Sequence, residues 1–308
     1  MCRVLSYLGK SISVSSLIHE PDNSLIKQSY NPRFMSHIQN LAGFGLLGWD
    51  YRSVMPERPY VYKTRELPFF DKNLQLLADK IHANCLLAHV RGVNYSIDEV
   101  VSYQNIHPFF FENTRLFMAH NGNMEGFDFM KYDLLKYIKP EIASQIAGTT
   151  DSEWIYALLI SQLMHNTTQL TCELNEVIPA LTNTLEILQK VRLKRGLNVA
   201  SPVNLFLTNG YFLLATRFVF DYGNYPPHHH SLAHLAYHSL WYTFGENYGC
   251  YDGEYKMVGD SQRKLSVIFA SEPLTEDTTS WIEVPEYSMI AALPENDEIK
   301  IAISDIDI

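Results

Sequence analysis

The chain opens with Met1-Cys2-Arg3-Val4-Leu5-Ser6-Tyr7-Leu8. Residues 3–8 alternate and are rich in strand formers, so we expect a strand with Cys2 at its start. If Met1 is removed, Cys2 carries both a thiol and a free α-amine. The thiolate is the nucleophilic form, and an α-amine with a pKa of roughly 7.7–8.0 can take the thiol proton near neutral pH. Such a residue needs no catalytic histidine.

The composition is that of an ordinary globular protein. Hydrophobic residues make up 46% of the 308 residues and charged residues 19%. No internal repeat, low-complexity segment or linker divides the chain, so we expect one domain over residues 1–308. The net charge of −10 disfavours nucleic acid or an anionic membrane as the main partner. No segment approaches the ~20 apolar residues of a membrane span.

The cysteines are few and far apart in the sequence. They stand at Cys2, Cys85, Cys172 and Cys250, with no CxxC pair among them. This spacing suits neither a disulfide framework nor a zinc knuckle, and it is compatible with a reducing cytoplasm. A cytoplasmic location is therefore expected.

Three segments bring polar residues to the ends of apolar runs. Residues 85–91 and 116–122 are each expected to form a buried strand, ending in Arg91 and in Asn121-Gly122. An Asn-Gly pair there is either a tight turn or, alternatively, a pair of donors for an oxyanion. Residues 148–153 precede an apolar helix, where Asp151 either caps the helix or faces a site.

The remaining pattern alternates helices with an antiparallel sheet. Residues 40–50 are a glycine-punctuated strand, in which the glycine density indicates either close approach of another backbone or a bulge. Residues 51–70 are expected to be irregular and exposed. A short helix follows near residues 74–81, and longer helices are expected over 154–164 and 173–195. Asn209-Gly210 predicts a hairpin, and the further strands are expected at 203–208, 211–217, 241–244, 265–270, 287–292 and 298–303.

A histidine-rich stretch raises the question of a metal. His228, His229, His230, His234 and His238 include positions that repeat every four residues, which would suit metal binding on one helical face. The stretch follows two prolines, and no cysteine or carboxylate cluster completes a ligand set. We therefore expect a helix carrying histidines and no physiological metal site.

Taken together, six motifs resemble those of the class II glutamine amidotransferases, enzymes with an N-terminal nucleophile that hydrolyse the side-chain amide of glutamine. The motifs are Met1-Cys2-Arg3, Gly48-Trp49, Ala88-His89-Val90-Arg91, Asn105-Ile106-His107-Pro108-Phe109, Ala119-His120-Asn121-Gly122 and Thr150-Asp151-Ser152-Glu153. Two later segments, Ala215-Thr216-Arg217 and Ala270-Ser271-Glu272-Pro273-Leu274, resemble the compact stand-alone branch of the family. That branch includes bacterial amidotransferases of the YafJ type and the fungal glutathione-degradation amidotransferase subunit.

The resemblance implies a role for each matching residue. Cys2 would be the nucleophile after removal of Met1, and Asn121 with Gly122 would hold the oxyanion. Arg91 would bind the substrate α-carboxylate through two parallel hydrogen bonds, for which a planar guanidinium is suited. Asp151 would pair with the substrate α-ammonium. No cofactor is implied.

The sequence also departs from the family pattern. After Arg91 the family usually has an alanine–threonine pair, whereas this chain has Gly92-Val93-Asn94, so that Asn94 is a candidate substrate contact on weaker grounds. Ala42 stands where the family often has an aspartate. The segment around residues 222–238 is longer than the minimal fold requires.

The resemblance implies an α+β fold, a four-layer αββα sandwich with two antiparallel sheets between helical layers. The active-site motifs fall within residues 2–153, and residues 154–308 would complete the sheets and helices. The expected activity is hydrolysis of a γ-glutamyl amide, in glutamine or a γ-glutamyl conjugate, through a Cys2 thioester that releases glutamate and ammonia or an amine. Two alternatives stay open: a glutaminase subunit that delivers ammonia to a separate synthase or works beside a peptidase subunit, and a non-catalytic binding module.

Overall fold

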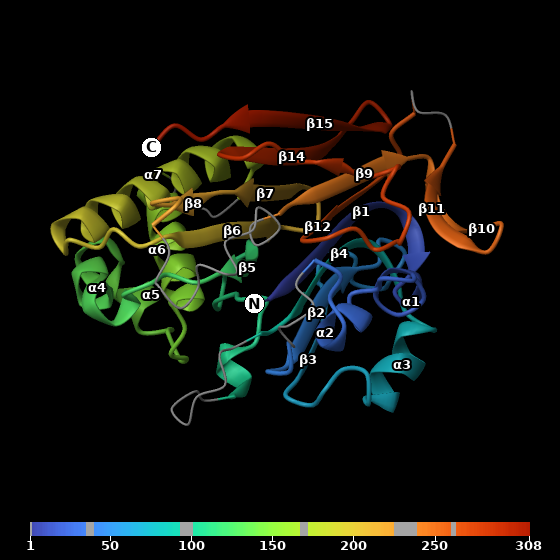
Figure 1. Ribbon diagram of the computed structural model, residues 1–308, viewed down its shortest axis with the longest axis horizontal. Helices are drawn as coiled ribbons and strands as arrows, with labels where there is room; N and C mark the ends of the chain where they lie inside the picture. The colour runs from blue at the N-terminus through green and yellow to red at the C-terminus, as the bar shows by residue number, and fades with distance from the viewer. Residues whose placement is uncertain (1, 35–39, 93–100, 167–171, 225–238, 260–262) are drawn as a thin grey trace.

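The computed structural model describes residues 2–34, 40–92, 101–166, 172–224, 239–259 and 263–308, with side chains undescribed at 164–166 (Figure 1). Two antiparallel sheets lie face to face at its centre. The first sheet has the strand order β13 (Ile282–Glu283), β9 (Trp241–Gly245), β12 (Ser266–Ala270), β1 (Arg3–Ser13), β4 (His82–Val90), β2 (Phe44–Trp49) and β3 (Tyr60–Thr64). The second has the order β15 (Glu298–Asp305), β14 (Ser288–Glu295), β7 (Leu213–Arg217), β6 (Ser201–Thr208) and β5 (Phe117–Gly122), with β8 (Val219–Phe220) paired to β6.

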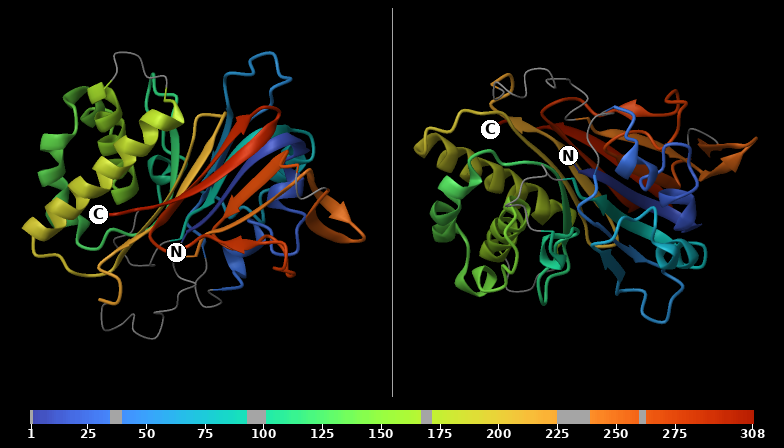
Figure 2. Two further views of the ribbon diagram at one scale, coloured as in Figure 1. Left: turned by 90° about the horizontal axis from the view of Figure 1, so that it is seen from above. Right: turned by 60° about the horizontal axis from the view of Figure 1, so that its bottom comes forward.

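Helices cover the outer face of each sheet (Figure 2). The long helices α6 (Asp151–Asn166) and α7 (Leu174–Lys194) lie against the second sheet, with α4 (Phe127–Leu134), η2 (Leu135–Tyr137) and α5 (Pro140–Ala143) beside them. The shorter α1 (Ser15–Ile18), α2 (Lys27–Tyr30) and α3 (Lys72–Ala78) lie on the side of the first sheet. The turn η1 (Tyr103–Asn105) lies between β4 and β5 in the chain, and β10 (Asn247–Tyr251) pairs with β11 (Glu254–Val258) as a separate hairpin.

Three apolar cores separate these layers. Side chains such as Val4, Leu87 and Phe206 fill the space between the two sheets. Leu5, which follows Val4 in β1, belongs instead to the core on the outer face of the first sheet, because successive side chains of a strand point to opposite faces. The third core lies between the second sheet and helices α6 and α7, where Leu205 and Leu185 are both fully buried. The expected αββα sandwich is confirmed.

One sequence prediction is wrong in detail, and one element was not predicted. Residues 51–70 were expected to be irregular, but residues 60–64 form the edge strand β3, paired with β2 from Phe44 to Gly48. An extended five-residue run rich in tyrosine and β-branched residues suits an edge strand despite the prolines around it. The hairpin β10–β11 was not predicted, although Asp252-Gly253 at its turn is a hairpin signal.

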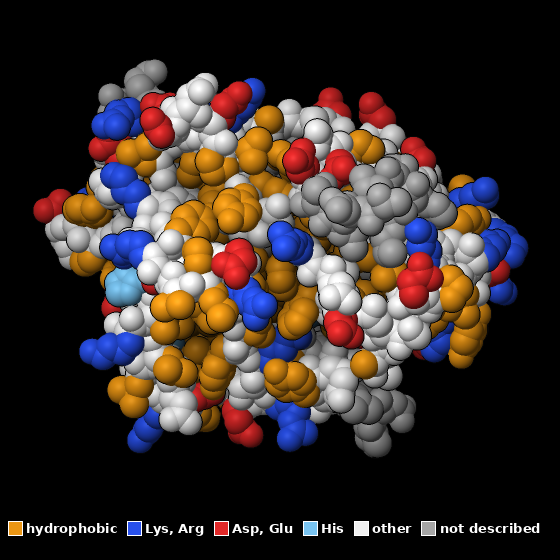
Figure 3. Space-filling view, turned by 180° about the vertical axis from the view of Figure 1, so that it is seen from behind, with side chains coloured by type: hydrophobic (Ala, Val, Ile, Leu, Met, Phe, Trp, Pro, Cys, Tyr) orange, Lys and Arg blue, Asp and Glu red, His pale blue; other side chains and the backbone are white. Residues whose placement is uncertain are grey.

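The described surface is mixed in character. On the face shown in Figure 3, lysine and arginine side chains are scattered among acidic and hydrophobic ones rather than gathered in one patch. Among the described residues, no helix has both the length and the apolar character needed to cross a membrane.

Candidate active site

Cys2 lies at the start of β1, a central strand bordered by β12 and β4. In the β1–β4 ladder Arg3 pairs with Val90 and Val4 with His89, so Cys2 comes opposite Arg91. Because strand side chains alternate, Cys2 projects from the same face as Val4, the face that meets the second sheet. The Cys2 side chain is buried, and its Sγ accepts the Gly92 N–H at 3.5 Å. A donor at this position can stabilise charge that develops on the sulfur.

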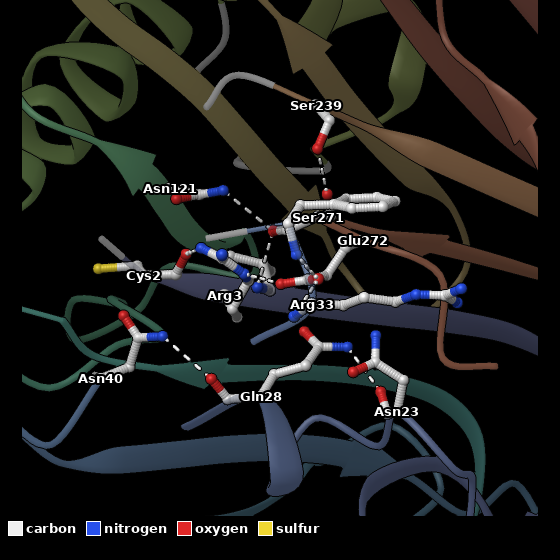
Figure 4. A network of polar contacts seen from close by, with 12 residues as sticks. Cys2, Arg3, Asn23, Gln28, Arg33, Asn40, Asn121, Ser239, Ser271 and Glu272 are labelled. Carbon is white, nitrogen blue, oxygen red and sulfur yellow. Dashed lines mark hydrogen bonds and ion pairs between the residues drawn. The ribbon is translucent and has the colours of Figure 1, made fainter. Parts of the chain in front are cut away.

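A buried ion pair beside Cys2 holds its main chain (Figure 4). Arg3 donates from Nη1 to the Cys2 carbonyl oxygen at 2.9 Å, and its Nε pairs with the Glu272 carboxylate. The other oxygen of Glu272 accepts the main-chain N–H groups of Arg33 and Phe34, each at 3.1 Å. Both partners of the pair are almost completely buried. The Cys2 carbonyl is therefore held by Arg3, which limits rotation of the residue that carries thiol and amine.

Asn121 and Gly122 lie within the β5 ladder, where they pair with Asn204 and Val203 of β6. The tight-turn alternative for this Asn-Gly pair is therefore wrong. The Asn121 amide contacts Ser271 Oγ at 3.0 Å, and the same oxygen accepts the Val4 N–H at 2.9 Å. This contact joins the second sheet to the strand that carries Cys2.

Glycines are required where other backbone segments approach closely. At Gly122 a Cβ would overlap the Pro202 carbonyl oxygen and the His120 ring. At Gly45 of β2 a Cβ would overlap the His107 carbonyl oxygen. The close backbone approach predicted from the glycine-rich strand is thus present. It lets the loop at residues 105–108 lie against β2, with the neighbouring Arg91 N–H donating to the Gly43 carbonyl at 2.8 Å.

Asp151 is the first residue of α6 and lies beside the end of β5. Its carboxylate accepts the Met124 N–H and the Ser152 N–H, both at 2.7 Å. Asn105 braces the preceding segment, donating from Nδ2 to Thr149 Oγ1 and accepting the Thr149 N–H, each at 2.9 Å. The carboxylate thus accepts hydrogen bonds at the helix start, and Asp151 stays partly exposed near the strand end.

The structure therefore brings Cys2, Arg91, Asn121, Gly122 and Asp151 to neighbouring strand and helix ends. Residues 71–293, which include four of these five, match the family model described as class II glutamine amidotransferases. The chain belongs to the class II glutamine amidotransferases. It is accordingly an enzyme of the amidohydrolase type.

Relatives of this amidotransferase include both curated proteins and solved structures. A Saccharomyces cerevisiae protein named probable glutamine amidotransferase DUG3 is 27% identical over 94% of this chain and 81% of its own length. A γ-glutamyl-hercynylcysteine sulfoxide hydrolase of Mycobacterium tuberculosis is 32% identical over 40% of this chain and 49% of its own. A class II domain protein from Silicibacter pomeroyi is similar in structure, with a TM-score of 0.60, 20% identity and 99% coverage of both chains.

Three histidines in the motifs that carry the site residues are buried, and burial lowers the pKa of each. His89 and His107 have ring centroids 4.0 Å apart, and the pKa of both falls well below the usual value. His120 contacts Ser152 Oγ at 2.9 Å, and the nearby Asp151 charge partly offsets the burial that lowers its pKa. These rings are therefore neutral at pH 7, and they support the site as packing and hydrogen-bonding groups.

Some expectations fall outside the described residues, and some contacts were not anticipated. Asn94 and the histidines at 228–238 lie outside the described ranges, as does most of the long segment at 222–238. Among the described residues, no group of three or more potential ligands is placed to hold a metal ion. Arg3, Ser271 and Glu272 stand in motifs quoted above, but no sequence pattern predicts a role for them. Their partners lie up to 269 residues away, so no local pattern could have revealed them.

Proposed function

We propose that this amidotransferase hydrolyses a γ-glutamyl amide bond, in glutamine or in a γ-glutamyl conjugate, through a thioester on Cys2. The observation that carries the proposal is the position of Cys2 in the sheet. Cys2 lies opposite Arg91 and is linked to Asn121 through Val4 and Ser271. The residues proposed as nucleophile, α-carboxylate ligand and oxyanion donor are thus neighbours in one hydrogen-bonded framework, which supports the proposal.

The first half of the reaction forms the thioester. The Cys2 α-amine, free after removal of Met1, takes the thiol proton, and the sulfur attacks the γ-carbonyl carbon. The carbonyl electron pair moves to oxygen, where Asn121 Nδ2 and the Gly122 N–H stabilise the charge; one such donor is typically worth about 2.7–4 kcal/mol. The C–N bond then breaks, and the ammonium of Cys2 returns its proton to the leaving ammonia or amine.

The second half releases glutamate. The same α-amine takes a proton from water, the resulting hydroxide attacks the thioester, the C–S bond breaks, and the ammonium returns the proton to the departing Cys2 sulfur. Throughout, Arg91 binds the α-carboxylate and Asp151 the α-ammonium, so that the side-chain amide reaches the thiol. Asn94 is a further proposed substrate contact. Asp151 is partly exposed, and two main-chain donors keep its carboxylate in place, which supports this role.

The names of two relatives support a γ-glutamyl substrate. One is called a probable glutamine amidotransferase, and the other a hydrolase of a γ-glutamyl conjugate. The second match covers about half of its relative, so that protein's own substrate does not transfer. We propose a single domain over residues 1–308, from which Met1 is removed in the mature chain. The four free cysteines support a reducing location such as the cytoplasm.

The test measures glutamate and amine release from glutamine and a panel of γ-glutamyl amides. We expect the wild-type chain, with an intact mass that lacks Met1, to release both products in equal amounts. Cys2→Ala should abolish release, whereas Cys250→Ala, which removes an exposed thiol elsewhere, should not. Full activity in material that retains Met1 would contradict the α-amine as base.

The same panel separates the alternatives. A glutaminase subunit of a separate synthase would act on glutamine alone and gain activity when its partner is added. A non-catalytic module would release no glutamate from any compound while still binding a γ-glutamyl group. Turnover of γ-glutamyl conjugates by the isolated chain would favour the leading proposal over both.

A further inference from the structure

Ser271 lies directly after β12, where the two sheets meet beside Cys2 (Figure 4). Its hydroxyl accepts the Val4 N–H at 2.9 Å and contacts the Asn121 amide at 3.0 Å. Its main chain is equally fixed, since the Ser271 N–H donates to the Val4 carbonyl at 2.9 Å and Ser239 Oγ donates to the Ser271 carbonyl at 2.7 Å. Ser271 is 3% exposed, so water has little access to it.

A count of donors and acceptors shows a mismatch at this contact. A serine hydroxyl has one proton and two acceptor positions. In the structure Asn121 Nδ2 donates to Ser271 Oγ, so both acceptor positions are filled, by Val4 and by Asn121. Asn121 Oδ1 is then buried without a partner among the described residues. Such an unpaired buried group costs about 1–3 kcal/mol.

A half-turn of the Asn121 amide pairs Oδ1 with the Ser271 proton, and it leaves Nδ2 as the buried group whose partner would be the oxyanion. The turn exchanges Oδ1 with Nδ2 and moves no other heavy atom. The Ser271 hydroxyl then donates its proton to Oδ1 while still accepting the Val4 N–H. Nδ2 takes the place of Oδ1, which in Figure 4 points away from Ser271, toward the side of the view where the Cys2 sulfur also lies.

We propose that Ser271 is a positioning residue for the hydrolysis, donating its hydroxyl proton to Asn121 Oδ1 and thereby turning the Asn121 Nδ2–H toward the oxyanion. The inference rests on the proposed function. Val4 lies two residues after Cys2, in β1. The strand that follows the nucleophile therefore also holds the Ser271 hydroxyl, which in turn orients the Asn121 amide. Ser271 itself does not touch the substrate.

The first test is Ser271→Ala, which removes the proton donor and leaves Asn121 in place. Without that donor, no hydrogen bond from position 271 favours the amide orientation in which Asn121 Nδ2 faces the oxyanion. We expect kcat for γ-glutamyl amide hydrolysis to fall about tenfold to hundredfold. This loss should not exceed the loss caused by removing the oxyanion donor in Asn121→Ala. Glutamine affinity, measured by calorimetry in the Cys2→Ala background, should stay within about twofold, because the oxyanion exists only after attack. An unchanged kcat would overturn the proposal.

A double-mutant cycle distinguishes positioning from general support. If Ser271 acts through Asn121, Ser271→Ala should cause no further loss of kcat in an Asn121→Ala chain. If Ser271 merely supports the sheet junction, the two losses multiply. A multiplicative result would therefore reject the proposal even if the single substitution is severe.

Two further variants guard against trivial explanations. Ser161→Ala removes an equally buried hydroxyl in α6 that also accepts a main-chain N–H, that of Lys139 at 3.0 Å, and should leave kcat unchanged. If Ser271→Ala does not fold, Ser271→Cys keeps the size with a weaker donor and completes the same cycle. Failure of the proposed function would give a different result. The wild-type chain would release no glutamate, or Cys2→Ala would still release it, with Ser271 unaltered in both.

Discussion

Asn121 belongs to the β5 ladder, and only its side-chain amide reaches toward the first sheet. Asn121→Ala removes this amide and leaves the backbone pairing intact. We expect kcat to fall roughly 10²–10³-fold, because the lost donor acts mainly when charge develops on the substrate oxygen. Rapid-quench or steady-state kinetics would measure kcat, and thermal unfolding would show that the variant is folded. A folded variant with near-normal kcat would remove the oxyanion role from this side chain.

Arg91 follows β4 and comes opposite Cys2, with its guanidinium almost completely buried. Arg91→Lys keeps the charge but loses the planar pair of donors. Since a hydrogen bond to a charged group contributes about 1.5–3 kcal/mol, KM for glutamine should rise roughly tenfold to hundredfold. The matched control is Arg195→Lys, at an exposed ion pair with Asp133, which should leave KM unchanged. An unaltered KM and kcat in Arg91→Lys would contradict the assignment.

At the scale of single elements, the close contact between β2 and the loop at residues 105–108 can be tested directly. Gly45→Ala places a methyl group against the His107 carbonyl oxygen. We expect a loss of about 1–3 kcal/mol in the free energy of unfolding, typical of overpacking. Gly249→Ala in β10 is the control, because its Cβ would have only ordinary contacts, the nearest at 3.4 Å. Equal unfolding midpoints for the two variants in urea would argue against this contact.

The elements differ in how far their sequences predict them. Cys85–Val90 and Phe117–Gly122 were predictable because each is an apolar run that ends in polar residues, and α7 because its apolar spacing continues to Lys194. The edge strand β3 was not predicted, because prolines flank a run of only five residues. Local pattern thus identified the buried elements best, since burial imposes the clearest periodicity.

The site was predictable only in part, for a related reason. Cys2, Arg91, Asn121 and Asp151 stand at motif positions that chemistry singles out. Ser271 gives no such signal, because its importance comes from a contact across 150 residues of sequence with Asn121. Tertiary contacts of this kind leave no period in the sequence, so they become visible only when both sheets are in place.

At the scale of the whole molecule, the buried histidines should make the fold sensitive to mild acid. Burial lowers the folded-state pKa of His89, His107 and His120. Between that lowered value and the unfolded value of about 6.5, the unfolded chain binds more protons. Stability should therefore be fully present above about pH 6.5 and be lost as the pH falls below it, by up to about 1.4 kcal/mol per pH unit for each histidine.

Urea unfolding at pH 7.5 and pH 5.5 would measure this loss. His107→Gln removes one titrating ring and should make the decline between the two pH values shallower, whatever its effect on absolute stability. His82→Gln, at an exposed position at the start of β4, should leave the decline as in the wild type. A decline equally steep in His107→Gln would contradict a contribution from this ring.

The position of Cys2 at the head of a central strand also has a practical consequence for anyone who prepares the protein. Its carbonyl is held by Arg3 and its strand is paired on both sides, so β1 does not need a free amino terminus to form. An affinity tag fused ahead of Cys2 would convert the amine into an amide nitrogen, which cannot accept a proton. On the proposed mechanism such a preparation would be folded and inert. A tag placed after Ile308, or a protease that cuts directly before Cys2, would yield active enzyme.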